Sequence, residues 1–131
     1  MDKYIESAFE IGSWDETPFD GAVGVSKLTR ASVTKTYTGD VVGTSTTEWL
    51  MAYEPDKSAT FVGLERIKGS ITGRQGSLVL THVGRFENGV ATAELSVVSG
   101  TNELKGVSGS GTFKADPAGA IVLDLTFGDA D

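Results

Sequence analysis

Apolar and polar residues alternate along most of this chain, which is the pattern of half-buried β-strands. Strands are predicted over residues 8–14, 28–38, 42–53, 59–72, 77–86, 90–98, 109–115 and 120–127. The segments between them are rich in Gly, Asn, Asp or Pro, as turns require. Asp15–Pro18 is expected to end the first strand, 19–27 to form a loop, and Asp116–Gly119 to turn the last pair of strands.

This arrangement predicts an all-β fold, a single eight-stranded antiparallel up-and-down β-barrel, because closure leaves no exposed sheet edge. A β-sandwich is the alternative. The 131 residues are enough for a single β-barrel domain spanning 1–131 and too few for two domains. Residues 102–105 have room for one turn of helix at most. Several small residues at expected inward positions, such as Gly63 and Ala93, suggest a hollow interior, although they are equally consistent with tight curvature.

The chain contains a single histidine, and a hairpin signal fixes which sheet face it occupies. Asn88-Gly89 separates two alternating runs, and this dipeptide favours a two-residue turn with positive φ at both positions. Phe86 then pairs with Ala91 and His82 with Leu95. His82 therefore lies on an otherwise apolar face.

A second turn brings a carboxylate to the same face. If Arg74 and Gln75 form the tip, Glu65 pairs with Gly84 and lies diagonally across from His82. Long side chains reach each other at that spacing. An ionisable pair is thus predicted inside the core.

The register of the strands over 28–38 and 42–53 has two interpretations. A four-residue loop at Glu54–Lys57 sends Glu48 inward beside Glu65, and a three-residue loop at Thr38–Asp40 places Arg30 there too. A slip of one residue would instead send Trp49, Met51 and Tyr53 inward, and hydropathy favours that row. Buried carboxylates need cationic partners, which favours the first interpretation.

The first interpretation leads to a catalytic hypothesis. Two glutamates that share a site with one arginine should raise the pKa of one carboxyl, and an imidazole can share the proton. The candidate catalytic residues are Arg30, Glu48, Glu65 and His82, which would act as general acids and bases in an isomerase or cyclase for an apolar metabolite. The expected ligand-binding residues of the lumen are Trp49, Leu50, Phe61, Leu80, Phe86 and Leu95.

Other readings of these residues compete with catalysis. Glu65 and His82 could form an internal hydrogen bond while Arg30 and Glu48 make a cross-strand salt bridge outside. Two further hypotheses for the whole protein are a binding module that carries a hydrophobic ligand without chemistry, and an interaction protein with a filled barrel. One imidazole with two glutamates is a weak metal site, so no metal and no cofactor are expected.

Charge and composition exclude several partners. Eighteen acidic residues against eleven Lys and Arg give a net charge of −7, which repels nucleic acid and anionic lipid. No apolar run is long enough to span a bilayer, and no signal peptide precedes the strands, so a cytoplasmic location is expected. An apolar small molecule is the expected partner. The outward residues Val62, Leu64, Val79 and Val83 predict a surface for a homo-oligomer, such as a dimer.

The runs Leu28–Asp40 and Gly63–His82, together with Ser13–Glu16 and Gly100–Gly106, resemble the bacterial domain-of-unknown-function family 3224 over nearly the whole chain. That family is similar to the allene oxide cyclase barrel type, which implies a closed eight-stranded barrel. The resemblance also implies the same residue types at Arg30, Glu48, Glu65 and His82, which supports the inward register. Allene oxide cyclases and dirigent proteins steer reactive small molecules, but transfer of that chemistry to this chain is fold-level analogy.

Overall fold

The computed structural model describes residues 2–21, 27–115 and 118–128. Its strands run in chain order around the sheet, with a single 3₁₀ turn before the last pair. They are β1 (Asp2–Asp20), β2 (Lys27–Gly39), β3 (Val41–Tyr53), β4 (Ala59–Ile71), β5 (Arg74–Glu87), β6 (Val90–Gly100), η1 (Asn102–Leu104), β7 (Ser108–Ala115) and β8 (Gly119–Thr126).

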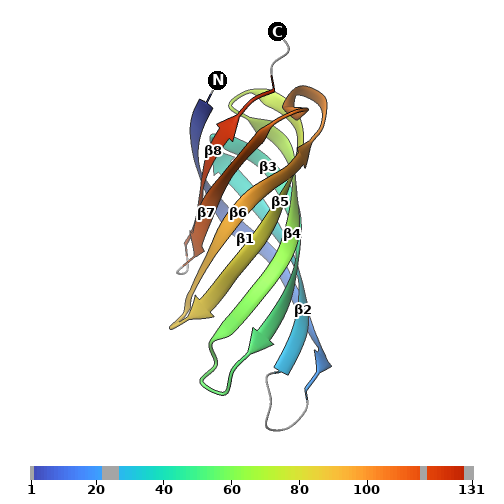
Figure 1. The fold of residues 1–131 in the computed structure, drawn as a ribbon, viewed down its shortest axis with the longest axis vertical. Helices are drawn as coiled ribbons and strands as arrows, with labels where there is room; N and C mark the ends of the chain where they lie inside the picture. Colours follow the sequence, from blue (N-terminus) through green and yellow to red (C-terminus); the bar gives the residue numbers. More distant parts are fainter. Residues whose placement is uncertain (1, 22–26, 116–117, 129–131) are drawn as a thin grey trace.

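The eight strands form one closed antiparallel barrel, in which β1 pairs with both β2 and β8. The predicted all-β up-and-down barrel is therefore confirmed. Figure 1 shows the start of β1 and the end of β8 at one end of the barrel, with the β3–β4 and β5–β6 connections at the other. We call this second end the mouth. None of the helical structure in the described ranges is long and apolar enough to cross a membrane.

The first strand is longer than predicted. β1 pairs with β2 up to Asp20, and Pro18 lies opposite Thr29 within that ladder. The predicted break at Asp15–Pro18 is wrong, because a register shift between Pro18 and Asp20 lets the strand continue past the proline, as proline at a bulge can. Part of the expected loop, residues 22–26, and part of the expected turn, residues 116–117, lie outside the described residues.

The β5–β6 hairpin forms as predicted. Asn88 and Gly89 both have positive φ, at 53° and 79°, and His82 pairs with Leu95. The β4–β5 turn differs, because Thr72 and Gly73 take the positive φ values and Glu65 pairs with Leu80 instead of Gly84. The displacement is an even number of residues, so the face of each side chain is unchanged. Glu65 and His82 still share the lumen.

The β3–β4 connection is one residue longer than predicted. Tyr53 pairs with Ala59, which leaves Glu54–Ser58 as the loop. Within it, Asp56 Oδ1 accepts hydrogen bonds from the Ser58 backbone N–H at 2.9 Å and from the Ser58 hydroxyl at 2.7 Å. This local bonding holds Ser58 in the loop and turns Trp49 and Met51 inward, so the predicted inward register of Glu48 is wrong.

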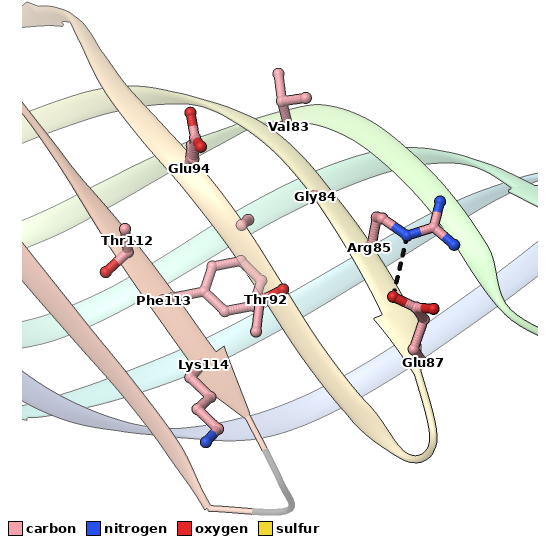
Figure 2. Close-up of a pocket in the computed structure, with 10 residues that line it drawn as sticks. Val83, Gly84, Arg85, Glu87, Thr92, Glu94, Thr112, Phe113 and Lys114 are labelled. Carbon is pink, nitrogen blue, oxygen red and sulfur yellow. Dashed lines mark hydrogen bonds and ion pairs between the residues drawn. The ribbon is translucent and has the colours of Figure 1, made fainter.

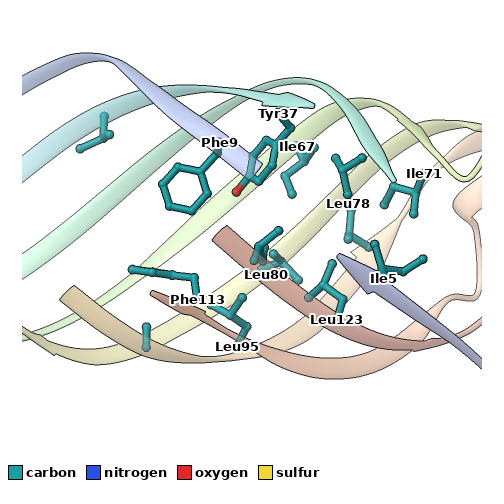
Figure 3. Packing of buried hydrophobic residues seen from close by; sticks show 14 of the residues in the cluster. Ile5, Phe9, Tyr37, Ile67, Ile71, Leu78, Leu80, Leu95, Phe113 and Leu123 are labelled. Carbon is teal, nitrogen blue, oxygen red and sulfur yellow. The ribbon is translucent and has the colours of Figure 1, made fainter. Parts of the chain in front are cut away.

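Inward side chains fill the lumen in layers. Aliphatic residues occupy the end near the termini, including Ile5, Ile71, Leu78 and Leu123, whereas Phe9, Tyr37 and Phe113 gather farther along the lumen (Figure 3). On the outer surface Val62, Leu64 and Val83 are exposed. Association of copies through that surface stays a prediction.

Candidate functional site

The Glu65 carboxylate lies at the centre of a buried polar group, which we call the Glu65 cluster. Oε2 accepts hydrogen bonds from the Tyr37 hydroxyl at 2.7 Å and the Ser45 hydroxyl at 2.6 Å. Oε1 lies 2.9 Å from His82 Nε2 and 3.4 Å from Lys35 Nζ. These five residues come from four consecutive strands, β2 to β5. The carboxylate is thus fully surrounded by donors, as a buried charge requires.

The hydrogen bonds of His82 define its tautomer. Trp49 Nε1 lies 3.1 Å from His82 Nδ1, and an indole N–H can only donate. Nδ1 must therefore be the unprotonated acceptor, and Nε2 carries the hydrogen that is donated to Glu65. His82 is a neutral imidazole held between an indole and a carboxylate.

Lys35 contributes a fully buried cation to the cluster. Its Nζ lies 4.6 Å from the ring centre of Phe9, 5.0 Å from that of Phe113 and 5.1 Å from that of Trp49. Ring faces attract cations at these distances. The ammonium is therefore stabilised by three aromatic rings as well as by Glu65.

Burial and charge act in opposite directions on the Glu65 cluster. Burial tends to raise the pKa of Glu65, but Lys35, His82 and Ser45 outweigh it and lower that pKa to about 2. Burial lowers the pKa of His82 and of Lys35, and in each case Glu65 opposes the change. Burial and the Glu65 charge together raise the pKa of Tyr37. At neutral pH Glu65 is therefore a carboxylate, and the hydrogen bond from Trp49 keeps His82 a neutral imidazole.

A small apolar cavity of about 130 Å³ lies at the mouth end of the lumen, and we call it the mouth cavity. Its lining is entirely apolar or aromatic. It consists of Phe9, Ile11, Trp14, Trp49, Met51, Phe61, Phe86, Ala91, Phe113 and Ala115.

The rings of Phe9, Trp49, Phe61 and Phe113 form what we call the aromatic floor of this cavity. Trp49 packs on Phe61 and Phe113, with ring centres 5.1 and 6.0 Å apart. On its other side the floor contacts the Glu65 cluster through Lys35 and His82. No member of the cluster lines the cavity, so the rings separate the polar group from any occupant.

A larger hollow, of about 520 Å³, lies on the outer surface of β5, β6 and β7. Charged residues line it, among them Glu94, Lys114 and the Arg85–Glu87 ion pair at 3.2 Å, together with the apolar Val83, Ala93 and Phe113 (Figure 2). None of the Glu65 cluster lines it. All four rings of the aromatic floor line the mouth cavity, and three of them connect it to the cluster, whereas Phe113 is the one floor ring that lines the outer hollow.

The predicted four-residue cluster does not form. Arg30 and Glu48 do meet, with Arg30 Nε 2.8 Å from Glu48 Oε1, but their side chains are 65% and 46% exposed on the outside of the barrel. Only Glu65 and His82 of the four candidates lie in the lumen. Because Arg30 and Glu48 share a sheet face, the one-residue difference between the predicted and the observed β3–β4 loop places both of them outside.

The residues expected to bind a ligand fall into three groups. Trp49, Phe61 and Phe86 line the mouth cavity. Leu80 and Leu95 are buried but do not line it. Leu50 is 51% exposed on the outer face, because it shares its parity with Glu48.

Sequence reasoning missed Lys35, Tyr37 and Ser45. A signal was present, since Lys35 shares the parity of Ala31, Val33 and Tyr37, an apolar row interrupted by one charge. This is the same pattern that identified His82. The predicted register placed Arg30 inward. Since Lys35 has the opposite parity, that register placed Lys35 on the outer face, where it was not a candidate.

Comparison with known proteins places the chain in a family. A family model described as protein of unknown function, DUF3224, matches residues 5–127. The chain belongs to the DUF3224 family. A crystal structure of a DUF3224 protein of unknown function from Shewanella oneidensis MR-1 is 29% identical, with a TM-score of 0.79, and the match covers 98% of this chain and all of that one. No curated protein matches.

Proposed function

We propose that this DUF3224 barrel is a binding module for a small apolar molecule, which occupies the mouth cavity on the aromatic floor. The observation that carries the proposal is the wholly apolar lining of a cavity that lies directly above a buried charged cluster. Ligand sites are typically concave and lined mainly by apolar and aromatic side chains.

The size of the cavity limits the ligand. A dry cavity of about 150 Å³ accommodates benzene in another protein, and the mouth cavity measures about 130 Å³. A single ring or a short branched aliphatic group therefore fits, and the rest of a larger molecule would extend into solvent. Burial of about 150 Å² of ring surface is worth about 4 kcal/mol, which corresponds to a Kd of about 1 mM.

Catalysis by Glu65 and His82 is the competing function, and their contacts argue against it. Both side chains are fully buried, and the acceptor nitrogen of His82 is occupied by Trp49. A general base must reach the proton that it removes. Beneath an intact aromatic floor neither group meets a bound molecule, so the cluster is better suited to holding the lumen together.

Binding can be tested with toluene and indole as probes and glucose as a polar control. Amide chemical shifts followed by NMR should move for residues around the mouth cavity with either apolar probe and not with glucose. Ala91→Leu places a larger side chain in the cavity and should weaken binding by about tenfold or more. Ala120→Leu makes the same change on the outer face of β8 and should have no effect.

The proposal fails if neither apolar probe shifts these resonances at millimolar concentration, or if Ala91→Leu and Ala120→Leu bind equally well. Conversion of a bound probe or metabolite to product by wild type, abolished in Glu65→Gln, would restore the enzyme hypothesis.

A further inference from the structure

Trp49 contacts both the mouth cavity and the Glu65 cluster. Its ring lines the mouth cavity and contacts the rings of Trp14 and Phe61 at 5.4 and 5.1 Å. Its indole N–H donates to His82 Nδ1 at 3.1 Å. The orientation of the central ring of the floor is thus set by a hydrogen bond to the only histidine in the chain.

Protonation of His82 would remove that acceptor. An imidazolium carries hydrogens on both nitrogens, so two N–H groups would face each other between Trp49 and His82. The indole would then have to leave its buried acceptor, and the floor of the cavity would change shape. An unpartnered buried donor is costly, which ties the ring position to the charge of the imidazole.

Several groups face His82 and determine its charge. From β4, Glu65 favours the protonated form, whereas Lys35 on β2 opposes it. From β3 and β7 the neighbours are the uncharged rings of Trp49 and Phe113. Burial is the largest influence and favours the neutral form.

We infer that His82 is a positioning residue for the mouth cavity: it holds Trp49 as a fixed floor, and protonation of its Nδ1 releases that ring and weakens binding of the apolar ligand. This inference rests on the proposed function, because it regulates the same site. Binding and protonation must then be reciprocally linked, so an occupied cavity makes His82 harder to protonate. If only the neutral form binds, the apparent Kd rises by about tenfold for each pH unit below the pKa of His82.

The test is a titration of wild-type protein with indole between pH 7.5 and 5, with the ¹⁵N shifts of His82 recorded in parallel. At pH 7.5 Nδ1 should be unprotonated and Nε2 protonated. The Kd should rise as His82 titrates, and saturating indole should lower the pKa of His82.

Trp49→Phe keeps a ring in the floor but removes the N–H, so its affinity should not vary with pH. Trp14→Phe also changes a tryptophan of the cavity, but its indole N–H bonds to Glu16, so the pH dependence should remain. If Trp49→Phe does not fold, the shift in the His82 pKa on binding to wild type decides the question.

The outcomes separate the two proposals. Absence of indole binding at every pH defeats the proposed function itself. Binding whose Kd is constant while His82 titrates overturns only the inference. A histidine that stays neutral until the barrel unfolds, or a Trp49→Phe variant with wild-type pH dependence, overturns it as well.

Discussion

Replacement of Glu65 by glutamine should destabilise the barrel strongly while leaving its shape unchanged. The substitution keeps the volume of the side chain but removes the charge that Lys35 and His82 face. Lys35 would then be a buried cation supported only by aromatic rings. Loss of one partner of a buried ion pair typically costs about 3–5 kcal/mol.

The pKa of Glu65 supplies a second measure of the same loss. The folded protein lowers it from an ordinary 4.5 to about 2, and a tenfold change in a protonation equilibrium is worth about 1.4 kcal/mol. Ionised Glu65 therefore contributes about 3 kcal/mol at pH 7. Because the folded pKa is the lower one, this contribution is fully present above pH 4.5 and is lost as the pH falls toward 2.

Urea unfolding followed by far-UV circular dichroism measures the effect. At pH 7 Glu65→Gln should reduce the free energy of unfolding by about 3–5 kcal/mol, and the difference from wild type should shrink below pH 4.5. Glu48→Gln makes the same chemical change in the exposed pair with Arg30 and should cost no more than about 1 kcal/mol. Equal losses at the two positions, or a Glu65→Gln loss that does not change with pH, would refute this reasoning.

Three further substitutions probe the lumen by urea unfolding. Among the described residues Thr47 has the one buried side-chain polar atom without a hydrogen-bond partner, so Thr47→Val should stabilise the protein by about 1 kcal/mol; destabilisation would mean that the hydroxyl is bonded. A Cβ at Gly63 would overlap the backbone carbonyl oxygen of Glu48 and lie 2.7 Å from Trp49 Cδ1, so Gly63→Ala should cost about 3 kcal/mol or more. Gly21→Ala, for which the nearest described atom is Lys27 Cγ at 3.9 Å, should be close to neutral. Phe113→Ala should cost about 3–5 kcal/mol and, because it enlarges the cavity, should favour indole over toluene more than wild type does; an unchanged ratio of the two affinities would contradict the place of Phe113 in the floor.

The sequence predicts the barrel and the Glu65–His82 pair because both depend on parity and turn chemistry. Asn88-Gly89 is a strong local signal, and the register of β5 and β6 follows from it. The turn at Thr72-Gly73 carries no such signal, since a β-branched residue rarely takes a positive φ, such as the 46° that Thr72 has. The prediction that Glu65 and His82 share a face still holds, because the pairing of β4 with β5 was displaced by an even number of residues.

The rest of the site depended on a loop length that residue types do not determine. Pro55 indicates a turn, but the hydrogen bonds from Ser58 to Asp56 set its end. One residue there decides whether Glu48 or Trp49 faces inward. The electrostatic argument for burying Arg30 with Glu48 failed because Lys35 already supplies the cation for Glu65.

The Glu65 cluster also bears on how the barrel assembles and how it can evolve. Glu65 takes its partners from β2, β3 and β5, so no isolated hairpin can satisfy its charge. The buried carboxylate therefore has its full set of donors only when all four strands are together, so the Glu65 cluster makes the stability of each of these strands depend on the others. Because loss of one charge leaves the other unpaired, Lys35 and Glu65 can be replaced at low cost only as a pair.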